Sequence, residues 1–127
     1  METKKILVAS DENGVVQVIS AKLRNNGFEV VTANNGDEAF ILCCQQKPEF
    51  VIADHQLPNI SGVELAEKIR KKSGLTDISF ILMTTKETEL DEKQMDKAGI
   101  ACCLTKPFSP KEILNRIENI LAGATTK

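Results

Sequence analysis

Polar and charged side chains follow the short apolar runs of this chain, each at the point where a run ends. They comprise acids, hydroxyl groups and an ammonium group, in Ser10-Asp11-Glu12, Asp54, Thr84-Thr85 and Lys106. In sheets of parallel strands, ligands bind outside the carboxyl ends of the strands. We therefore expect these residues to converge on one edge of a sheet and to form the chemical site of the protein.

Their residue types indicate one kind of chemistry. Carboxylates such as Asp11 and Asp54 suit Mg²⁺, which usually takes one or two protein carboxylates and keeps several waters. An aspartate can also act as a nucleophile and form an aspartyl phosphate. Phosphoryl transfer depends chiefly on positioning and on neutralising charge, and Lys106 would supply positive charge while Thr84 would donate to a phosphoryl oxygen. The set therefore predicts a phosphoryl-accepting site that uses Mg²⁺.

The elements that must position these side chains alternate along the chain. Short, continuous apolar runs suit strands that are buried on both faces of a parallel sheet. They lie at Ile6–Ala9, Phe50–Ala53, Phe80–Met83 and Ala101–Leu104, with a weaker candidate at Phe28–Thr32. Helical patterns occupy the segments between the runs, which predicts a doubly wound α/β sandwich around a parallel sheet.

Local signals indicate where several of the helices begin and end. The segments Ser61–Glu64 and Ser109–Glu112 have the sequence of a capping box. Pro110 adds a residue that is favoured at the first helical position. Gly27 is placed to end the first helix. We therefore expect helices to begin after Ser61 and Ser109.

Length and composition limit the classes of function. The chain has 127 residues, of which 42% are hydrophobic and 27% are charged. This predicts one domain over residues 1–127, with a core at about 5–121 and a short tail at 122–127. With 16 basic and 18 acidic residues, the formal net charge is −2. We therefore expect no direct binding of nucleic acid. No apolar run suits a membrane helix or a signal peptide, so we expect a cytoplasmic chain without membrane contact.

The cysteines and the lone histidine have plainer interpretations. The pairs Cys43-Cys44 and Cys102-Cys103 lack the CxxC spacing of zinc and redox sites. Free cysteine behaves as a small hydrophobic residue, and we expect all four to be buried, reduced and structural. Side chains alternate along a strand, so His55 should point away from Asp54 and be an exposed loop residue.

Four motifs in order give the chain a resemblance to a known family. They are Ile6–Glu12, Val51–Pro58 with Gly62, Ile81–Thr85 and Leu104–Phe108. From about Lys5 to Leu121, the chain resembles the receiver domain of bacterial two-component response regulators. The resemblance implies a flavodoxin-like (βα)5 sandwich whose parallel sheet has the strand order 2-1-3-4-5.

The resemblance also implies a role for each matching residue. Asp54 matches the phosphoacceptor, and Lys106 matches the lysine that bonds the acyl phosphate. Thr84 matches the hydroxyl residue that contacts the phosphoryl group in the active state. Asp11 matches the second acid of the pair that binds Mg²⁺. Asp54 itself and the backbone carbonyl of Gln56 match the other metal ligands.

Two positions depart from the family pattern. Ser10 stands where the first acid of the pair is usual. A register shift by one residue would make Asp11-Glu12 the pair but would turn the strand's side chains to the opposite faces, so we interpret Ser10 as a substitution. We expect weaker Mg²⁺ binding, with Glu12, or Ser10 through a water molecule, as a further ligand. Cys103 stands where a ring that turns inward on activation is usual.

The resemblance implies a signalling switch and not an enzyme. A histidine kinase or phosphotransfer protein would donate a phosphoryl group to Asp54 with Mg²⁺. The domain would then bind a downstream protein, or a second copy of itself, through the face of the fourth helix, fifth strand and last helix. Ser10 and Cys103 leave open an alternative, a pseudo-receiver that acts as a phosphorylation-independent interaction module. A phosphatase is disfavoured because Gln56 stands where the haloacid-dehalogenase-like pattern has a second acid.

Overall fold

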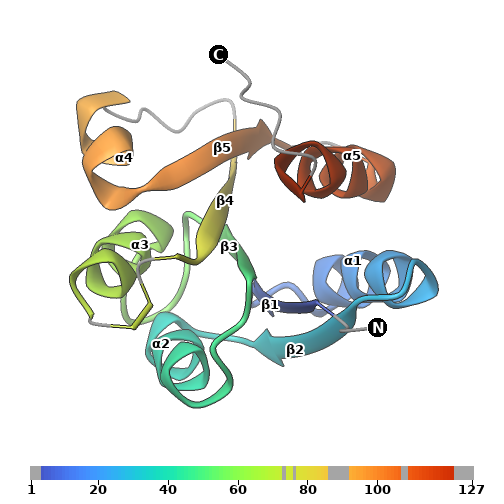
Figure 1. The fold of residues 1–127 in the computed structure, drawn as a ribbon, viewed down its shortest axis with the longest axis horizontal. Coiled ribbons are helices and arrows are strands. Elements are labelled where there is room, and N and C mark those ends of the chain that lie inside the picture. Colours follow the sequence, from blue (N-terminus) through green and yellow to red (C-terminus); the bar gives the residue numbers. More distant parts are fainter. Residues whose placement is uncertain (1–3, 73, 76, 86–91, 107–108, 122–127) are drawn as a thin grey trace.

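A single sheet of parallel strands runs through the protein (Figure 1). The computed structural model describes residues 4–72, 74–75, 77–85, 92–106 and 109–121. Within these residues the sheet has five strands, β1 Lys5–Ala9, β2 Glu29–Ala33, β3 Phe50–Asp54, β4 Ser79–Thr84 and β5 Ile100–Thr105. Their order, β2-β1-β3-β4-β5, confirms the expected flavodoxin-like topology. The tail expected at 122–127 lies outside the described residues.

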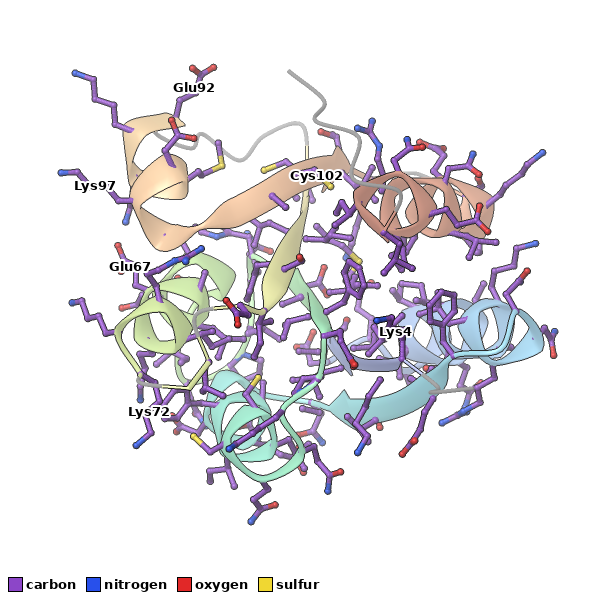
Figure 2. All side chains as sticks on the ribbon, viewed as in Figure 1. Lys4, Glu67, Lys72, Glu92, Lys97 and Cys102 are labelled. Carbon is purple, nitrogen blue, oxygen red and sulfur yellow. The ribbon has the colours of Figure 1, made fainter. Side chains whose placement is uncertain are left out.

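Helices cover both faces of this sheet. Figure 1 shows two of them together on one face, α1 Asn13–Asn25 and α5 Pro110–Leu121. The other face carries α2 Gly36–Gln46, α3 Gly62–Lys71 and α4 Glu92–Ala98. In Figure 2 the labelled charged side chains of α4, Glu92 and Lys97, extend outward from the molecule. Among the described residues, no helix has the length and apolar character needed to cross a membrane.

The capping signals seen in the sequence form in the structure. Ser61 Oγ accepts a hydrogen bond from the Glu64 amide at 3.1 Å, and Glu64 accepts one from the Ser61 amide at 2.9 Å. Ser109 and Glu112 make the same reciprocal pair at the start of α5. Gly27, with φ 91°, follows the end of α1 as expected. The first of these boxes fixes where α3 begins, which is close to the end of β3.

The strands are in register at their carboxyl ends. Ala9 of β1 pairs with Ala53 of β3, and the next residue, Asp54, pairs with Met83 of β4. Thr84 then pairs with Thr105 of β5. The residues that follow these pairs therefore reach the same edge of the sheet, which is where the sequence predicted the site.

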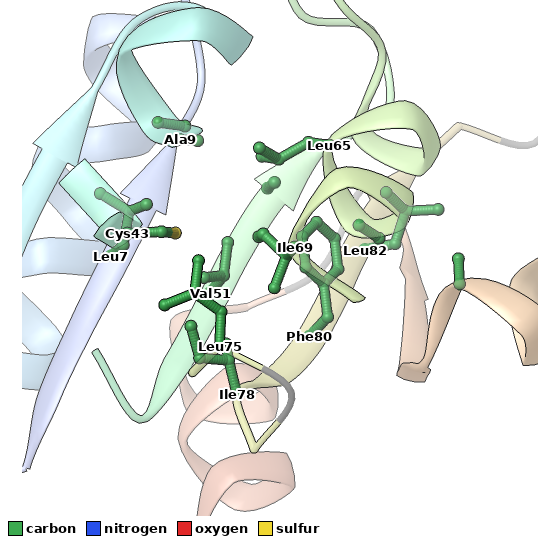
Figure 3. Packing of buried hydrophobic residues seen from close by; sticks show 14 of the residues in the cluster. Leu7, Ala9, Cys43, Val51, Leu65, Ile69, Leu75, Ile78, Phe80 and Leu82 are labelled. Carbon is green, nitrogen blue, oxygen red and sulfur yellow. The ribbon is translucent and has the colours of Figure 1, made fainter. Parts of the chain in front are cut away.

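Apolar side chains fill both spaces between the sheet and the helices. Successive strand residues point to opposite faces, so neighbouring residues belong to different clusters. Figure 3 shows the cluster beneath α2, α3 and α4, which includes Leu7, Val51, Leu65, Ile69 and Phe80. The cluster beneath α1 and α5 includes Ile6, Val8, Ile52, Ile81, Ile113 and Ile117. Burial on both faces explains why the strands read as continuous apolar runs.

The cysteines are free thiols, but only one is fully buried. Cys43 lies in the core, whereas Cys44, Cys102 and Cys103 are partly buried. The expectation of four buried cysteines was therefore wrong for three of them. Cys102 and Cys103 lie on β5, an edge strand with one neighbour, and they alternate between the two clusters. Cys44 contacts the core only from its margin.

Cys43 should be protected from alkylation in the folded protein. Burial, with a smaller contribution from neighbouring Cys44, raises the pKa of Cys43 from 9.0 to about 12. At pH 8 we expect iodoacetamide to modify Cys43 about a hundredfold more slowly in the folded chain than in urea, because the thiolate is the nucleophile. Peptide mass spectrometry after timed quenching measures this. Equal rates for Cys43 in the folded chain and in urea would contradict it.

The same shift has a consequence for stability at alkaline pH. Between pH 9.0 and about 12 the folded chain keeps the Cys43 proton and the unfolded chain releases it. The stability associated with this thiol is therefore complete below pH 9.0 and is lost as the pH rises toward about 12.

Candidate functional site

Asp54 is a buried carboxylate at the end of β3, with a donor on each of its oxygens. Its relative exposure is 4%. The hydroxyl of Ser10 donates to Oδ2 at 2.5 Å, and the ammonium of Lys106 lies 2.6 Å from Oδ1. Buried carboxylates need such partners, because an unpaired buried charge is strongly unfavourable. The protein thus fixes this side chain from two sides.

Ser10 continues β1 and is itself buried, with 1% relative exposure. Its amide donates to the carbonyl of Ala33 at 3.1 Å, which extends the pairing of β1 with β2 by one residue. Its Oγ accepts a hydrogen bond from the Glu12 amide at 3.1 Å. The expected role of Ser10 as a metal ligand through water stays a prediction. The direct bond to Asp54 was not foreseen from the sequence.

Lys106 joins two acids from different parts of the chain. Its Nζ lies 2.5 Å from Glu12 Oε1 as well as 2.6 Å from Asp54 Oδ1. Its backbone amide donates to the carbonyl of Thr84 at 2.7 Å, which places it beside the end of β4. Burial by itself lowers the pKa of Lys106, but hydrogen bonds to Asp54 and Glu12 outweigh it and leave the pKa above the ordinary lysine value. The ammonium is therefore charged at neutral pH.

A cavity of about 400 Å³ opens at this edge of the sheet. The residues predicted for metal binding or phosphoryl transfer line this cavity, namely Asp11, Glu12, Asp54, Gln56, Thr84 and Lys106. Ser10 is the exception, and it contacts Asp54 instead. Thr84 is buried at its wall, and Asp11 is exposed at its mouth. The structure therefore brings the predicted set together, while the role of each residue stays a prediction.

His55 lines the same cavity, which the sequence did not predict. It is half-buried, and its Nδ1 is buried with no hydrogen-bond partner in the part of the chain that the structure describes. His55 lies in a loop after β3, as expected, but the expectation that it is exposed was wrong. The His55 amide donates to the Met83 carbonyl at 2.8 Å, and its own carbonyl accepts from the Gly62 amide at 2.8 Å. These two bonds hold the backbone of His55 against β4 and the start of α3.

The oxygen atoms at the cavity suit a hard divalent cation. Asp11 and Asp54 supply two carboxylates, and Gln56 lies beside them. Mg²⁺ commonly uses one or two carboxylates and completes its shell with water, so these residues fit it. Within the described ranges, no cluster of three or more acids, histidines or cysteines is arranged to hold a metal. The residues therefore offer Mg²⁺ a sparse set of ligands, with a hydroxyl at position 10 where a third carboxylate would strengthen binding.

Comparison with known proteins gives a consistent result. The family model for the response regulator receiver domain matches residues 6–118. The alkaline phosphatase synthesis transcriptional regulatory protein PhoP of Bacillus subtilis is 34% identical, over 93% of this chain and 48% of that protein. The phosphate regulon transcriptional regulatory protein PhoB of Pseudomonas aeruginosa is 33% identical, over 95% of this chain and 53% of that protein. The chain thus spans about half the length of these curated relatives.

Solved structures match over nearly the whole length of both chains. The chemotaxis response regulator CheY4 of Vibrio cholerae superposes with a TM-score of 0.85 at 26% identity, covering 94% of this chain and 99% of that one. A response regulator from Chloroflexus aurantiacus gives 0.86 at 29% identity, covering 95% and 99%. The BeF3-activated DrrB receiver domain gives 0.79 at 28% identity, with the same coverage.

Proposed function

The chain belongs to the family of response regulator receiver domains, the signalling domains of two-component systems, and on this basis we propose that Asp54 accepts a phosphoryl group from a histidine kinase or a phosphotransfer protein. One observation carries the proposal. Asp54 lies at the wall of a cavity that is large enough for a phosphoryl group, with the Lys106 ammonium 2.6 Å from its Oδ1.

The reaction transfers one phosphoryl group to Asp54, and positive groups at the site neutralise the negative charge of that group. A carboxylate oxygen of Asp54 forms a bond to phosphorus while the bond from phosphorus to the donor atom breaks, and the donor keeps that electron pair. Lys106 neutralises charge on the transferred group. Asp11, Asp54 and the backbone carbonyl of Gln56 would hold Mg²⁺, which supplies further positive charge when bound.

Thr84 would pass the effect of phosphorylation from Asp54 to the rest of the domain. Its side chain lies at the cavity wall at the end of β4, where its hydroxyl can donate to a phosphoryl oxygen. We propose that the change reaches a downstream protein, or a second copy of the chain, through the face of α4, β5 and α5. On that face Cys103 lies with its sulfur 3.3 Å from Met95 Sδ. Cys103 has no aromatic ring to turn inward, so the effect of phosphorylation would reach α4 through the contact between Cys103 and Met95.

Several expectations stay predictions. The relatives are named transcriptional regulatory proteins, and the chain matches about half of each. The absence of direct nucleic-acid binding by this chain, its pairing with a second copy and its cytoplasmic location therefore stand as predictions. We do not propose the phosphorylation-independent module, because Asp54, Thr84 and Lys106 converge on one cavity.

Intact-mass spectrometry after incubation with acetyl phosphate tests the proposal. We expect one phosphoryl increment in the presence of Mg²⁺, formed on Asp54. The Asp54→Asn variant should gain none, because an amide oxygen at the same place is a far weaker nucleophile than a carboxylate. The chain has no tryptophan, so fluorescence does not offer the usual alternative readout.

Two outcomes would reject the proposal. The first is no increment with acetyl phosphate at high Mg²⁺ and none with a histidine kinase of broad specificity. The second is an increment that persists in Asp54→Asn. Circular dichroism of the variant, together with its thermal unfolding, serves as the control that it folds.

A further inference from the structure

The start of α3 is packed against the backbone that carries Asp54. The Gly62 amide, at the first residue of α3, donates to the His55 carbonyl at 2.8 Å. A Cβ added to Gly62 would lie 2.5 Å from the Asp54 carbonyl oxygen, so the two backbones are already in close contact. The capping box of Ser61 and Glu64 fixes the first turn of the helix at this place. A shift of the backbone at Asp54 would therefore move the start of α3.

α3 is a continuous helix with its inner face packed in the core. It has ten residues, which gives it a length of about 15 Å. The apolar residues of its buried face are Val63, Leu65, Ala66 and Ile69. Closely packed interiors have low compressibility and transmit strain. A displacement at the first turn of α3 is therefore expected to reach its last turn.

The last turn of α3 contacts the junction between α4 and β5 through Arg70. The guanidinium of Arg70 fills the space where a side chain of Gly99 would lie, since a Cβ there would overlap Nη2, Cζ and Nε. Gly99 has φ 76°, which residues with a side chain rarely adopt. Its amide donates to the carbonyl of Asp96 in α4 at 3.1 Å. The guanidinium thus lies on the residue that joins α4 to β5.

α4 is held to the rest of the protein by few contacts. It lies beside α3 on the same face of the sheet (Figure 1). Among its seven residues only Ala98 is buried. Met95 Sδ lies 3.3 Å from Cys103 Sγ in a partly buried contact, and Gln94 donates to Glu67 of α3 at 3.4 Å at the surface. An element with so few buried contacts can change its position at low cost in free energy.

The first residues of β5 allow such a change. Phe80 of β4 pairs with Ile100, but the next residue, Ile81, pairs with Cys102. One more residue therefore lies between these pairs on β5 than on β4, and the strand bends locally. Together with the conformation of Gly99, this irregularity permits α4 to turn relative to β5 while the rest of the strand keeps its pairing.

We propose that α3 forms a second connection between Asp54 and α4, with the contact of Arg70 on Gly99 as its last step. The inference rests on the proposed function, and it adds to the connection through Thr84. Phosphorylation of Asp54 would displace the start of α3 and, through Arg70, the junction of α4 with β5. The side chain of Cys103 has no part in this connection, so it suits a chain that lacks an aromatic ring at that position.

Hydrogen exchange of the α4 backbone, measured by mass spectrometry with and without acetyl phosphate and Mg²⁺, tests the inference. In the native chain, phosphorylation should change the exchange rate of α4 by at least about threefold, since coupling between sites is commonly of this size or larger. Arg70→Ala should still gain one phosphoryl increment. The change in α4 should then fall below about 1.5-fold, as for sites with little coupling.

Lys71→Ala is the matched control for Arg70→Ala. Both variants shorten an exposed basic side chain in the last turn of α3, but only Arg70 lies on Gly99. Lys71→Ala should therefore keep the full change in exchange. Because Arg70 is exposed, Arg70→Ala is expected to fold, and circular dichroism checks this.

Gly99→Ala tests the same contact from the other side. The new Cβ would displace the guanidinium, so the response of α4 to phosphorylation should again be reduced. Gly27→Ala is its control, because Gly27 has φ 91° and a Cβ there would meet nothing within 4 Å. It introduces similar backbone strain and should keep the full response. Adding Gly99→Ala to Arg70→Ala should reduce the response no further, because the two changes remove one contact.

The contrary outcomes separate this inference from the proposed function. A full response of α4 in Arg70→Ala would overturn the inference, and so would a native α4 whose exchange does not respond to phosphorylation. An equal loss of response in Lys71→Ala would also overturn it, because the effect would then belong to α3 in general. All three leave Asp54 as the phosphoacceptor. A native chain that gains no phosphoryl increment would reject the proposed function, and this inference with it.

Discussion

Replacing Lys106 by methionine is expected to slow the phosphorylation of Asp54 by about a hundredfold or more, the size seen when one preorganised charge-stabilising donor is removed. The Lys106 ammonium lies 2.6 Å from Asp54 Oδ1, and both residues line the cavity. Methionine keeps much of the length of the side chain but carries no charge. Initial rates with acetyl phosphate at saturating Mg²⁺, followed by intact mass, measure the effect.

Glu12→Gln is the matched control for this variant. It removes the other ion pair of Lys106 and leaves the contact with Asp54 in place. The Glu12 side chain is 56% exposed, and exposed ion pairs contribute about 0–1 kcal/mol, so we expect a change in rate of less than about threefold. Equal losses in the two variants would show that Lys106 acts by holding Glu12 and not by stabilising charge at Asp54.

The place of the site could be predicted from the sequence because it depends on the backbone. Strands buried on both faces produce apolar runs, and the end of each run marks the edge of the sheet. Parallel register then brings Asp54, Thr84 and Lys106 to one cavity, as the structure has them. Only the positions of these residues follow from that reasoning; their roles stay predictions until phosphorylation is measured.

The contacts inside the site could not be predicted, because they depend on the path of a loop and on rotamers. No pattern of residues indicates that the amide of Glu12 donates to Ser10, or that the Glu12 carboxylate contacts Lys106, more than ninety residues away in the chain. The partial burial of His55 was missed for a related reason. Strand alternation was applied at a residue where the chain leaves β3 and is drawn toward α3 by the bond from Gly62.

Gly62→Ala is expected to lower both stability and phosphorylation. Gly62 is the first residue of α3, and its amide donates to the His55 carbonyl at 2.8 Å. A Cβ added there would lie 2.5 Å from the Asp54 carbonyl oxygen, 2.6 Å from Leu82 Cδ1 and 3.0 Å from the His55 Cα. Two of these three atoms are backbone, so α3 would have to move away from the end of β3. We expect a loss of about 1–3 kcal/mol in the free energy of unfolding, as for other overpacked sites.

Urea denaturation followed by circular dichroism measures this loss, and Gly14→Ala is its control. Gly14 lies in the first turn of α1, and a Cβ there would meet nothing within 4 Å. Alanine favours helix over glycine by up to about 1 kcal/mol, so this variant should be as stable as the native chain or more so. If Gly62→Ala had the same urea midpoint of unfolding as the native chain, the prediction would be wrong, and α3 would be able to shift without a loss of stability.

A double-mutant cycle separates the backbone obstacle from the side-chain one. If Leu82 were the main obstacle, Leu82→Ala would make room for the new Cβ and would offset part of the cost of Gly62→Ala. Because the Asp54 carbonyl is at least as close and cannot retreat without moving β3, we expect a coupling of about 0.5 kcal/mol, the low end of the range for residues in contact. The phosphorylation rate should then fall equally in Gly62→Ala with and without Leu82→Ala, because in both the displaced helix moves the backbone that carries Asp54.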